Sequence, residues 1–308
     1  MKKKYISDEW QLKQKGHENF DFVDVAVNDD NLLFIDPCLI ENWNDAWAIK
    51  ATKHINSYFD NLFKAYYTCN RKDMRCLLSH AGEQNATRLG YGKGDNGKGN
   101  TADGLLEIFQ PLEQLIHSIK TMGKAEDLLL LIPGFAEDGM SDLLTNILHE
   151  CLHQFTMEQM YKYGIQSNGT KAFYTWDIRA GEWIKVEKPV YFVSGKELLL
   201  VPKNIVRKNY LFGVSQYFTR IILERMIDEG GYRDAEGKAI PKKEIVKSKR
   251  YSGEHWQYDE VIKYTIKNND ALDEYHRKLP GFYMEHGKPM TNKELDFSIY
   301  GYVVAKSA

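Results

Sequence analysis

The sequence has few cysteines, and this scarcity argues against a disulfide-stabilised fold. Its 308 residues include four cysteines, Cys38, Cys69, Cys76 and Cys151, and no two of them stand in a CxxC spacing. Small secreted domains depend on a dense, paired set of cysteines. We therefore expect free thiols that are buried as small apolar side chains.

Long apolar runs and an excess of one charge are also missing. The segment MKKKYISDEW is followed by no apolar stretch, and no run approaches the roughly 18 residues needed to cross a bilayer. The 41 basic and 43 acidic side chains leave a net charge of -2, which argues against a broad basic surface for nucleic acid. No internal repeat is visible. We expect a cytoplasmic protein.

The remaining composition is that of an ordinary globular protein. Hydrophobic residues make up 43%, aromatic residues 13% and charged residues 27%, which excludes collagen-like and disordered classes. The length suits one large domain or two modest ones.

The order of apolar patterns predicts a mixed α/β fold. A short apolar run stops at Asp36-Pro37 as a strand would, and a helical stripe follows between Trp47 and Phe63. Further segments read as a helix interrupted near Pro111, a buried strand in EDLLLLIPGF, a helix over residues 141–156, strands between residues 171 and 207, and helices beyond Tyr210. We predict a nuclease-like α/β core over residues 1–209, with a glycine-rich loop at residues 90–104, and a mainly helical C-terminal lobe over residues 210–308.

One helical segment spells a zinc-peptidase motif. In His149-Glu150-Cys151-Leu152-His153 the two histidines stand at i and i+4, so both point from one helix face, and Glu150 can hold the attacking water. The same face would also suit a solvent-exposed amphipathic helix.

A third zinc ligand would decide between these interpretations. Thr156 and Gln159 stand where the metzincin continuation needs Gly and His, so that subclass is excluded. Glu182 and Glu187 are the downstream candidates, although both fall in predicted strand or loop. Zn²⁺ held by His149 and His153 is the alternative cofactor.

Acidic side chains at the edges of apolar segments suggest a different metal site. Asp36, Asp138 and Asp142 follow or flank predicted strands. Carboxylates at strand ends can bind Mg²⁺, and a nearby lysine such as Lys203 can stabilise charge on a phosphate. The same residues would also serve as simple strand-end caps.

Restriction-endonuclease-like folds carry an acid two residues before their catalytic lysine. Here the triplet is Val201-Pro202-Lys203, and the nearest preceding acid, Glu197, stands six positions before the lysine. The sequence thus departs from that pattern at the acid.

The glycine-rich loop is a candidate for phosphate contacts. GKGDNGKG, Gly92 to Gly99, approaches the P-loop pattern but has Gly99 where a hydroxyl should bind magnesium. We expect Arg88, Lys93 and Lys98 to contact a nucleic-acid backbone, with a merely flexible loop as the alternative.

Four segments in order, LLFIDPCLI, EQNATRLGYGKG, FAEDGMSDLLTNIL and LLLVPKNIVRKNY, carry a family resemblance. Over residues 30–210, and more loosely to about residue 280, the chain resembles an uncharacterised bacterial family associated with antiphage-defence neighbourhoods. The resemblance implies a cytoplasmic defence component that works with other protein subunits. It covers Asp36, Glu83, Asp138, Asp142 and Lys203, whereas the family pattern has unrelated residues where this chain has His149, Glu150 and His153.

Three functional hypotheses follow. The first is a defence-associated, Mg²⁺-dependent nuclease whose metal is held by Asp142 with Asp138, Glu83 or Asp36. The second is a non-catalytic sensor or scaffold subunit, suggested by aromatic residues of the C-terminal lobe: Trp256, Tyr258, Tyr264 and Tyr275. The third is a zinc metallopeptidase.

Overall fold

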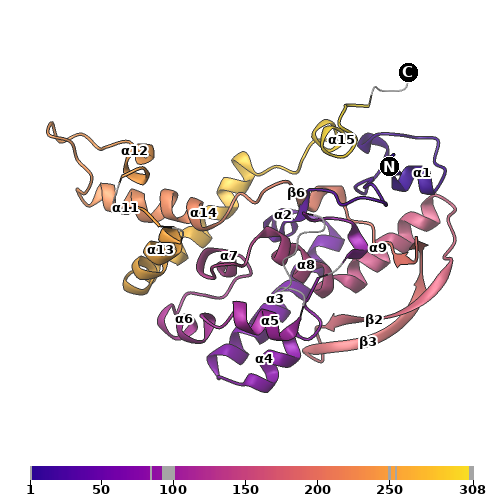
Figure 1. The fold of residues 1–308 in the computed structure, drawn as a ribbon, viewed down its shortest axis with the longest axis horizontal. Helices are drawn as coiled ribbons and strands as arrows, with labels where there is room; N and C mark the ends of the chain where they lie inside the picture. Colours follow the sequence, from indigo (N-terminus) through magenta and orange to yellow (C-terminus); the bar gives the residue numbers. More distant parts are fainter. Residues whose placement is uncertain (1, 84, 92–100, 249–250, 254, 305–308) are drawn as a thin grey trace.

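The computed structural model describes residues 2–83, 85–91, 101–248, 251–253 and 255–304. Helices predominate and a few small sheets accompany them, so the fold is mixed α/β as predicted (Figure 1). The N-terminal elements are α1 (Ile6–Glu9), η1 (His17–Asn19), β1 (Phe34–Ile35), α2 (Pro37–Asn42), α3 (Ala46–Tyr67), α4 (Arg71–Leu78), η2 (Asn85–Thr87), α5 (Ala102–Ile108), α6 (Leu112–Ser118), α7 (Asp127–Leu131), α8 (Glu137–Ile147) and α9 (His149–Lys162).

The second half contains the strands and the C-terminal helices. They are β2 (Gly169–Asp177), β3 (Glu182–Val190), β4 (Phe192–Val193), β5 (Lys196–Glu197), η3 (Lys203–Ile205), β6 (Val206–Arg207), α10 (Val214–Tyr217), the π-helical turn η4 (Phe218–Ile222), α11 (Leu223–Asp228), α12 (Lys242–Val246), α13 (Trp256–Lys267), α14 (Asp270–His286) and α15 (Asn292–Tyr300). In the described residues the strands pair as three antiparallel two-stranded sheets, β1-β6, β2-β3 and β4-β5.

The long helix α3 is the centre of the N-terminal half. Asp45 caps it by accepting a hydrogen bond of 2.8 Å from the amide of Trp47. Residues spaced three and four apart bury one side of the helix, including Ala51, Ile55 and Tyr58. Because α3 contacts α2, α4, α6, α8, α9 and β2, it holds together most of the elements discussed below.

The β2-β3 hairpin lies along α8 and α9 (Figure 1). Its register pairs Gly169 with Val190 at one end and Asp177 with Glu182 at the other. Gly181 has φ +66 in the connecting turn, a conformation that favours glycine. The hairpin therefore covers one face of the helix that carries the HECLH sequence.

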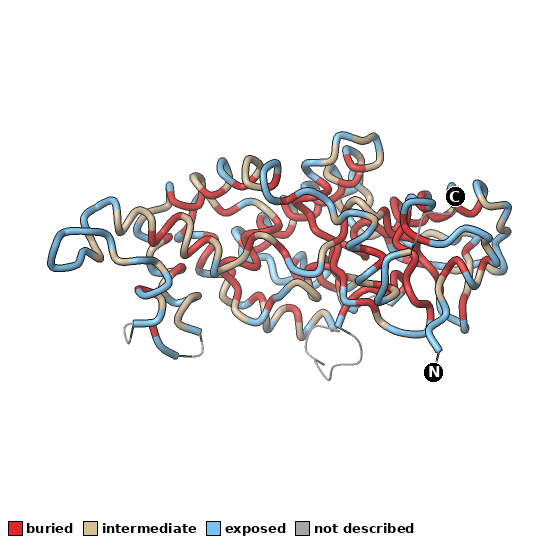
Figure 2. The backbone as a smooth tube through the Cα atoms, turned by 90° about the horizontal axis from the view of Figure 1, so that it is seen from above, coloured by how far each residue is buried: buried red, intermediate tan, exposed pale blue. Residues whose placement is uncertain are grey.

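The apolar core continues across the expected boundary at residues 209 and 210. Buried side chains form one cluster from the N-terminal segment to α14 and α15. The buried residues, red in Figure 2, extend along much of the molecule. At the C-terminal end, Asp296 of α15 accepts hydrogen bonds from the backbone N and the Nδ1 of His17, at 2.9 and 2.7 Å. The helix α15 thus returns to pack on the N-terminal segment.

Two sequence expectations were wrong in detail. EDLLLLIPGF forms helix α7 rather than a strand, because an apolar run without periodicity fits either structure and leucine is a good helix former. Of the four cysteines, Cys38 and Cys151 are buried, but Cys69 and Cys76 are exposed.

Candidate functional site

Helix α8 presents polar residues at every fourth position: Asp138, Asp142 and Asn146. It follows helix α7, so Asp138 and Asp142 stand on a helix and not at a strand end as expected. Asn146 Nδ2 donates to the carbonyl of Gly82 at 2.6 Å and to that of Asp142 at 3.0 Å. This contact holds the segment that contains Glu83 against the same face of α8.

The chain approaches α8 a second time at Gly90 and Tyr91. The amide of Tyr91 donates to Asp138 Oδ1 at 3.3 Å. Gly90 has φ +124, and a Cβ atom there would lie 2.7 Å from the same carboxylate oxygen. A side chain at residue 90 would therefore be both strained and obstructed. Glycine at this position is what allows the loop to approach Asp138.

These contacts bring carboxylates from three parts of the chain close together. Burial raises the pKa of the half-buried Asp138, the nearby Glu83 and Asp30 raise it further, and the Tyr91 amide lowers it. Clustered carboxylates of this kind attract cations. We define the acidic face of α8 as Glu83, Asp138 and Asp142.

The acidic face does not by itself enclose a metal. Among the described residues, no group of three or more His, Cys, Asp or Glu side chains is arranged to hold a metal ion. Mg²⁺, however, is usually bound by one or two carboxylates together with waters and substrate phosphates. The face therefore fits a magnesium ion that is completed by substrate, and does not fit a preformed all-protein cage.

Asp36 is buried and has a structural role. Its Oδ1 caps α2 by accepting from the amide of Cys38 at 2.8 Å, and its Oδ2 accepts from the Tyr283 hydroxyl at 2.8 Å. The side chain is fully buried, and burial raises its pKa to about 6 against the lowering effect of Tyr283 and Arg207. Asp36 thus joins α2 to α14 and does not reach solvent.

The expected cationic residues are also engaged elsewhere. Lys203 Nζ donates to the carbonyl of His17 at 2.6 Å. Arg88 is buried, and its guanidinium donates to the carbonyls of Val27 and Asn85. In this structure both side chains therefore bind the protein's own backbone. Lys93 and Lys98 lie outside the described residues.

The HECLH segment begins a new helix and faces the interior. A break at Leu148 separates α9 from α8. His149 is buried with its ring stacked on Phe173, 3.9 Å between centroids, and its Nε2 lies 3.1 Å from Glu197 Oε1. Lys171 Nζ donates to the other oxygen of Glu197 at 2.8 Å. The expected exposed polar stripe is therefore covered by the hairpin.

The other members of the motif point to different partners. His153 Nε2 donates to the carbonyl of Pro189 at 2.8 Å, and its Nδ1 is buried with no hydrogen-bond partner among the described atoms. Glu150 pairs with Lys188. Within the part of the chain that the structure describes, no third ligating side chain joins the two histidines. The expected ligands Glu182 and Glu187 are exposed on β3.

The family of the chain can be stated from its sequence. A family model described as "Domain of unknown function (DUF8370)" matches residues 11–212, more than half of the 308 residues. The chain belongs to the DUF8370 family. No curated protein and no solved structure matches it. The matched part of this DUF8370 chain contains the whole acidic face of α8 and ends just before α10.

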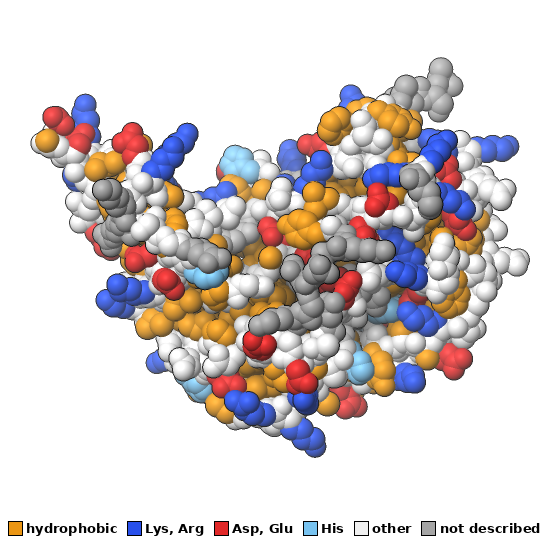
Figure 3. Space-filling model, viewed as in Figure 1, with side chains coloured by type: hydrophobic (Ala, Val, Ile, Leu, Met, Phe, Trp, Pro, Cys, Tyr) orange, Lys and Arg blue, Asp and Glu red, His pale blue; other side chains and the backbone are white. Residues whose placement is uncertain are grey.

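The DUF8370 chain shows no helix, in its described part, that is long and apolar enough to cross a membrane. Lysine, arginine and acidic side chains are intermingled on the face seen in Figure 3, in keeping with the near-zero net charge.

Sequence reasoning missed the partner of His149. Glu197 stands 48 residues further along the chain, and it lies in the short strand β5 that pairs with β4. No local pattern connects the two residues, because the hairpin between them decides which glutamate reaches the helix. An apolar residue stacked on a histidine, here Phe173, also has no signal in the sequence.

Proposed function

We propose that this DUF8370 protein is a cytoplasmic antiphage-defence component that hydrolyses phosphodiester bonds with Mg²⁺ at the acidic face of α8, together with partner subunits. The observation that supports this best is the convergence of Glu83, Asp138 and Asp142 next to the glycine at residue 90. The resemblance to a defence-associated family supports the biological setting.

In this proposal the carboxylates of the acidic face would hold Mg²⁺. Asp138 and Asp142, one helical turn apart, would bind Mg²⁺ directly or through water, with Glu83 as the third acid. A bound Mg²⁺ polarises a phosphoryl oxygen and lowers the pKa of a coordinated water. Because the chain supplies few ligands, phosphates of DNA or RNA would complete the coordination.

The test is cleavage of single- and double-stranded DNA and RNA with Mg²⁺ or Mn²⁺, with co-expressed partner proteins present. We expect Asp142→Asn and Asp138→Asn each to lower the rate by about a hundredfold. Asp259→Asn, on the exposed side of α13, is the matched control and should keep full activity. Absence of cleavage under every metal, together with full phage protection by Asp138→Asn/Asp142→Asn, would refute the proposal.

A non-catalytic subunit of the same system is the second candidate. It is favoured by the engagement of Asp36, Arg88 and Lys203 in structural hydrogen bonds. The aromatic residues expected to form its interface do not favour it, because they pack inside the molecule. Trp256, Tyr264 and Tyr275 belong to or pack against the apolar core, and the Tyr258 hydroxyl donates to the carbonyl of Leu129 in α7. Stable complex formation and phage protection by the doubly substituted protein would support this candidate.

A further inference from the structure

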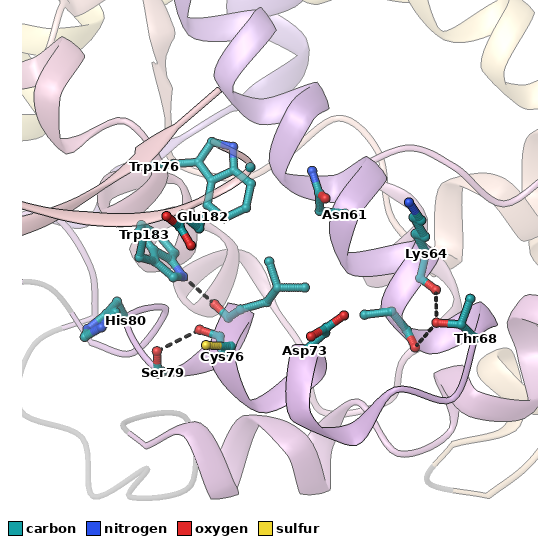
Figure 4. A pocket seen from close by; sticks show the side chains of 13 residues that line it. Asn61, Lys64, Thr68, Asp73, Cys76, Ser79, His80, Trp176, Glu182 and Trp183 are labelled. Atoms are coloured by element: carbon teal, nitrogen blue, oxygen red, sulfur yellow. Dashed lines mark hydrogen bonds between the residues drawn. The ribbon is translucent and has the colours of Figure 1, made fainter. Parts of the chain in front are cut away.

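A cavity of about 340 Å³ opens between α3, α4 and the turn end of the β2-β3 hairpin (Figure 4). Its volume lies in the range of small-molecule sites. It contains none of the residues of the acidic face and none of the HECLH histidines. Its lining includes Lys64, Asp73, His80, Trp176, Glu182 and Trp183.

Two tryptophans form a fixed aromatic wall of this cavity. Trp183 Nε1 donates to the carbonyl of Leu77 at 2.7 Å, and Trp176 Nε1 donates to Ser57 Oγ at 3.1 Å. The two indole rings meet edge to face with centroids 5.6 Å apart. Because both N–H groups are occupied, each ring is held in place beside the cavity, and Trp183 is half-buried.

Acidic and amide groups stand around this wall. Glu182 is exposed beside Trp183, and its carboxylate forms no hydrogen bond or ion pair within the described part of the chain. Asp73 lies across the cavity on α4, as Figure 4 shows, and Asn61 approaches from α3. Asn61 donates its Nδ2 to the carbonyl of Ser57 at 2.8 Å, which leaves its Oδ1 as an acceptor.

Positive charge in the cavity comes from Lys64 alone among its described lining residues. His80 stacks on Tyr174, with 3.6 Å between ring centroids, and burial lowers the pKa of His80. Its imidazole is therefore neutral near pH 7. Two carboxylates face one ammonium, so the net charge of the lining is negative and suits a cationic ligand more than an anionic one.

We propose that this cavity binds a small organic cation, an alkylammonium or guanidinium group, against Trp183 and between the carboxylates of Glu182 and Asp73. Tryptophan gives the strongest cation–π attraction of the aromatic side chains. A carboxylate beside it adds a charge-assisted hydrogen bond to the N–H groups. A metal ion is a poorer fit, because the described residues place no three ligating side chains together here.

Titration of the full-length protein with agmatine, followed by calorimetry and tryptophan fluorescence, tests the proposal. We expect saturable binding that Glu182→Gln weakens by about tenfold. Lys64→Gln should strengthen binding a few-fold, because it removes a repelling charge. Glu187→Gln, also exposed on β3 but outside the cavity, is the matched control and should bind as the unchanged protein does.

Two further ligands complete the test. One distinguishes an arginine side chain from a free amine as the natural ligand, and the other tests whether the cavity binds an anion instead. Stronger binding of N-acetyl-arginine amide than of agmatine would assign the site to an arginine side chain of a protein partner, whereas the reverse would assign it to a free amine. Both results support an organic-cation site. Absence of saturable binding by either compound would overturn the proposal, and so would tighter binding of AMP that is weakened by Lys64→Gln and unaffected by Glu182→Gln.

Discussion

His149 of α9 and Glu197 of β5 form a buried pair, with Nε2 and Oε1 3.1 Å apart. Lys171 of β2 binds the second carboxylate oxygen of Glu197 at 2.8 Å. Burial alone would raise the pKa of Glu197, but His149 and Lys171 outweigh this effect and lower it. The histidine that begins the HECLH sequence therefore ties three secondary-structure elements together.

Removal of Glu197 should destabilise the fold. Glu197→Ala leaves the buried His149 and the half-buried Lys171 without their partner, and we expect a loss of about 3 kcal/mol in the free energy of unfolding. Glu187→Ala, on the exposed side of the hairpin, should change it by less than about 0.5 kcal/mol. Urea denaturation at pH 7 measures both. Equal stabilities of the two variants would show that the pair has no structural importance.

The contacts of the HECLH side chains also bear on the zinc alternative. His153 points to the carbonyl of Pro189 and Glu150 to Lys188, so a zinc ion would require both side chains to leave their present partners. We expect protein purified without chelator to contain far less than one zinc per chain, with no change in His153→Ala. Elemental analysis decides this. Stoichiometric zinc that disappears in the variant would restore the peptidase hypothesis.

Local patterns predicted much of the secondary structure correctly. The strand that stops at Asp36-Pro37, the helix through residue 63 and the break near Pro111 correspond to β1, α3 and the gap between α5 and α6. These signals are local: a proline, an Asp cap or a helical repeat of apolar residues. EDLLLLIPGF carried no such signal, because a run of leucines has no period, and its strand assignment was wrong.

The candidate site was predictable only in part. The four-residue spacing of Asp138 and Asp142 places both on one helix face, but the approach of Glu83 depends on the long-range bond from Asn146 to Gly82. For the other expected site residues, burial determines the role of the side chain. Asp36 and Arg88 have the residue types that a nuclease needs, yet the apolar packing around them could not be read from their neighbours in the chain.

The buried Asp36, which accepts a hydrogen bond from Tyr283, should make the stability of the fold depend on pH in a defined direction. Because burial raises the folded-state pKa of Asp36 to about 6, the folded chain binds more protons than the unfolded chain between about pH 4 and pH 6. The contribution of Asp36 to the free energy of unfolding therefore falls as the pH rises through this window. Tyr283→Phe removes a bond that favours the ionised form, and so raises this pKa further.

Tyr283→Phe is consequently expected to cost about 2 kcal/mol at pH 8, where Asp36 is ionised, and clearly less at pH 5, where it is protonated. Denaturation curves at both pH values measure the difference. Tyr161→Phe, at a side chain 90% exposed, is the control and should be neutral at both. A loss for Tyr283→Phe that is equal at pH 5 and pH 8 would contradict the assigned coupling.

Glu126 is a buried carboxyl that should oppose folding at alkaline pH. It is 4% exposed, and its Oε1 has no hydrogen-bond partner among the described atoms. The ammonium of Lys124 lies 3.8 Å from that oxygen but only 3.2 Å from Glu41. Burial raises the pKa of Glu126 to about 7 from 4.5, Asp127 adds to the increase, and Lys124 opposes it.

The raised pKa of Glu126 determines how the free energy of unfolding changes with pH. Between about pH 4.5 and pH 7 the folded chain holds a proton on Glu126 that the unfolded chain has lost, so the free energy of unfolding decreases as pH rises. Glu126→Gln keeps the shape of the side chain and cannot ionise. We expect the variant to match the unchanged protein at pH 4.5 and to be more stable by roughly 3 kcal/mol at pH 8.

Urea denaturation of both proteins from pH 4.5 to pH 8 tests this, and the difference between them cancels the other titrating groups. Glu41→Gln, at the more exposed partner of Lys124, is the matched control and should show a difference that varies little with pH, because a solvated ion pair contributes under about 1 kcal/mol. A Glu126→Gln variant that is less stable than the unchanged protein at pH 8 would mean that the ionised carboxylate is held by Lys124 in the folded state, and that the ion pair rather than burial controls this residue.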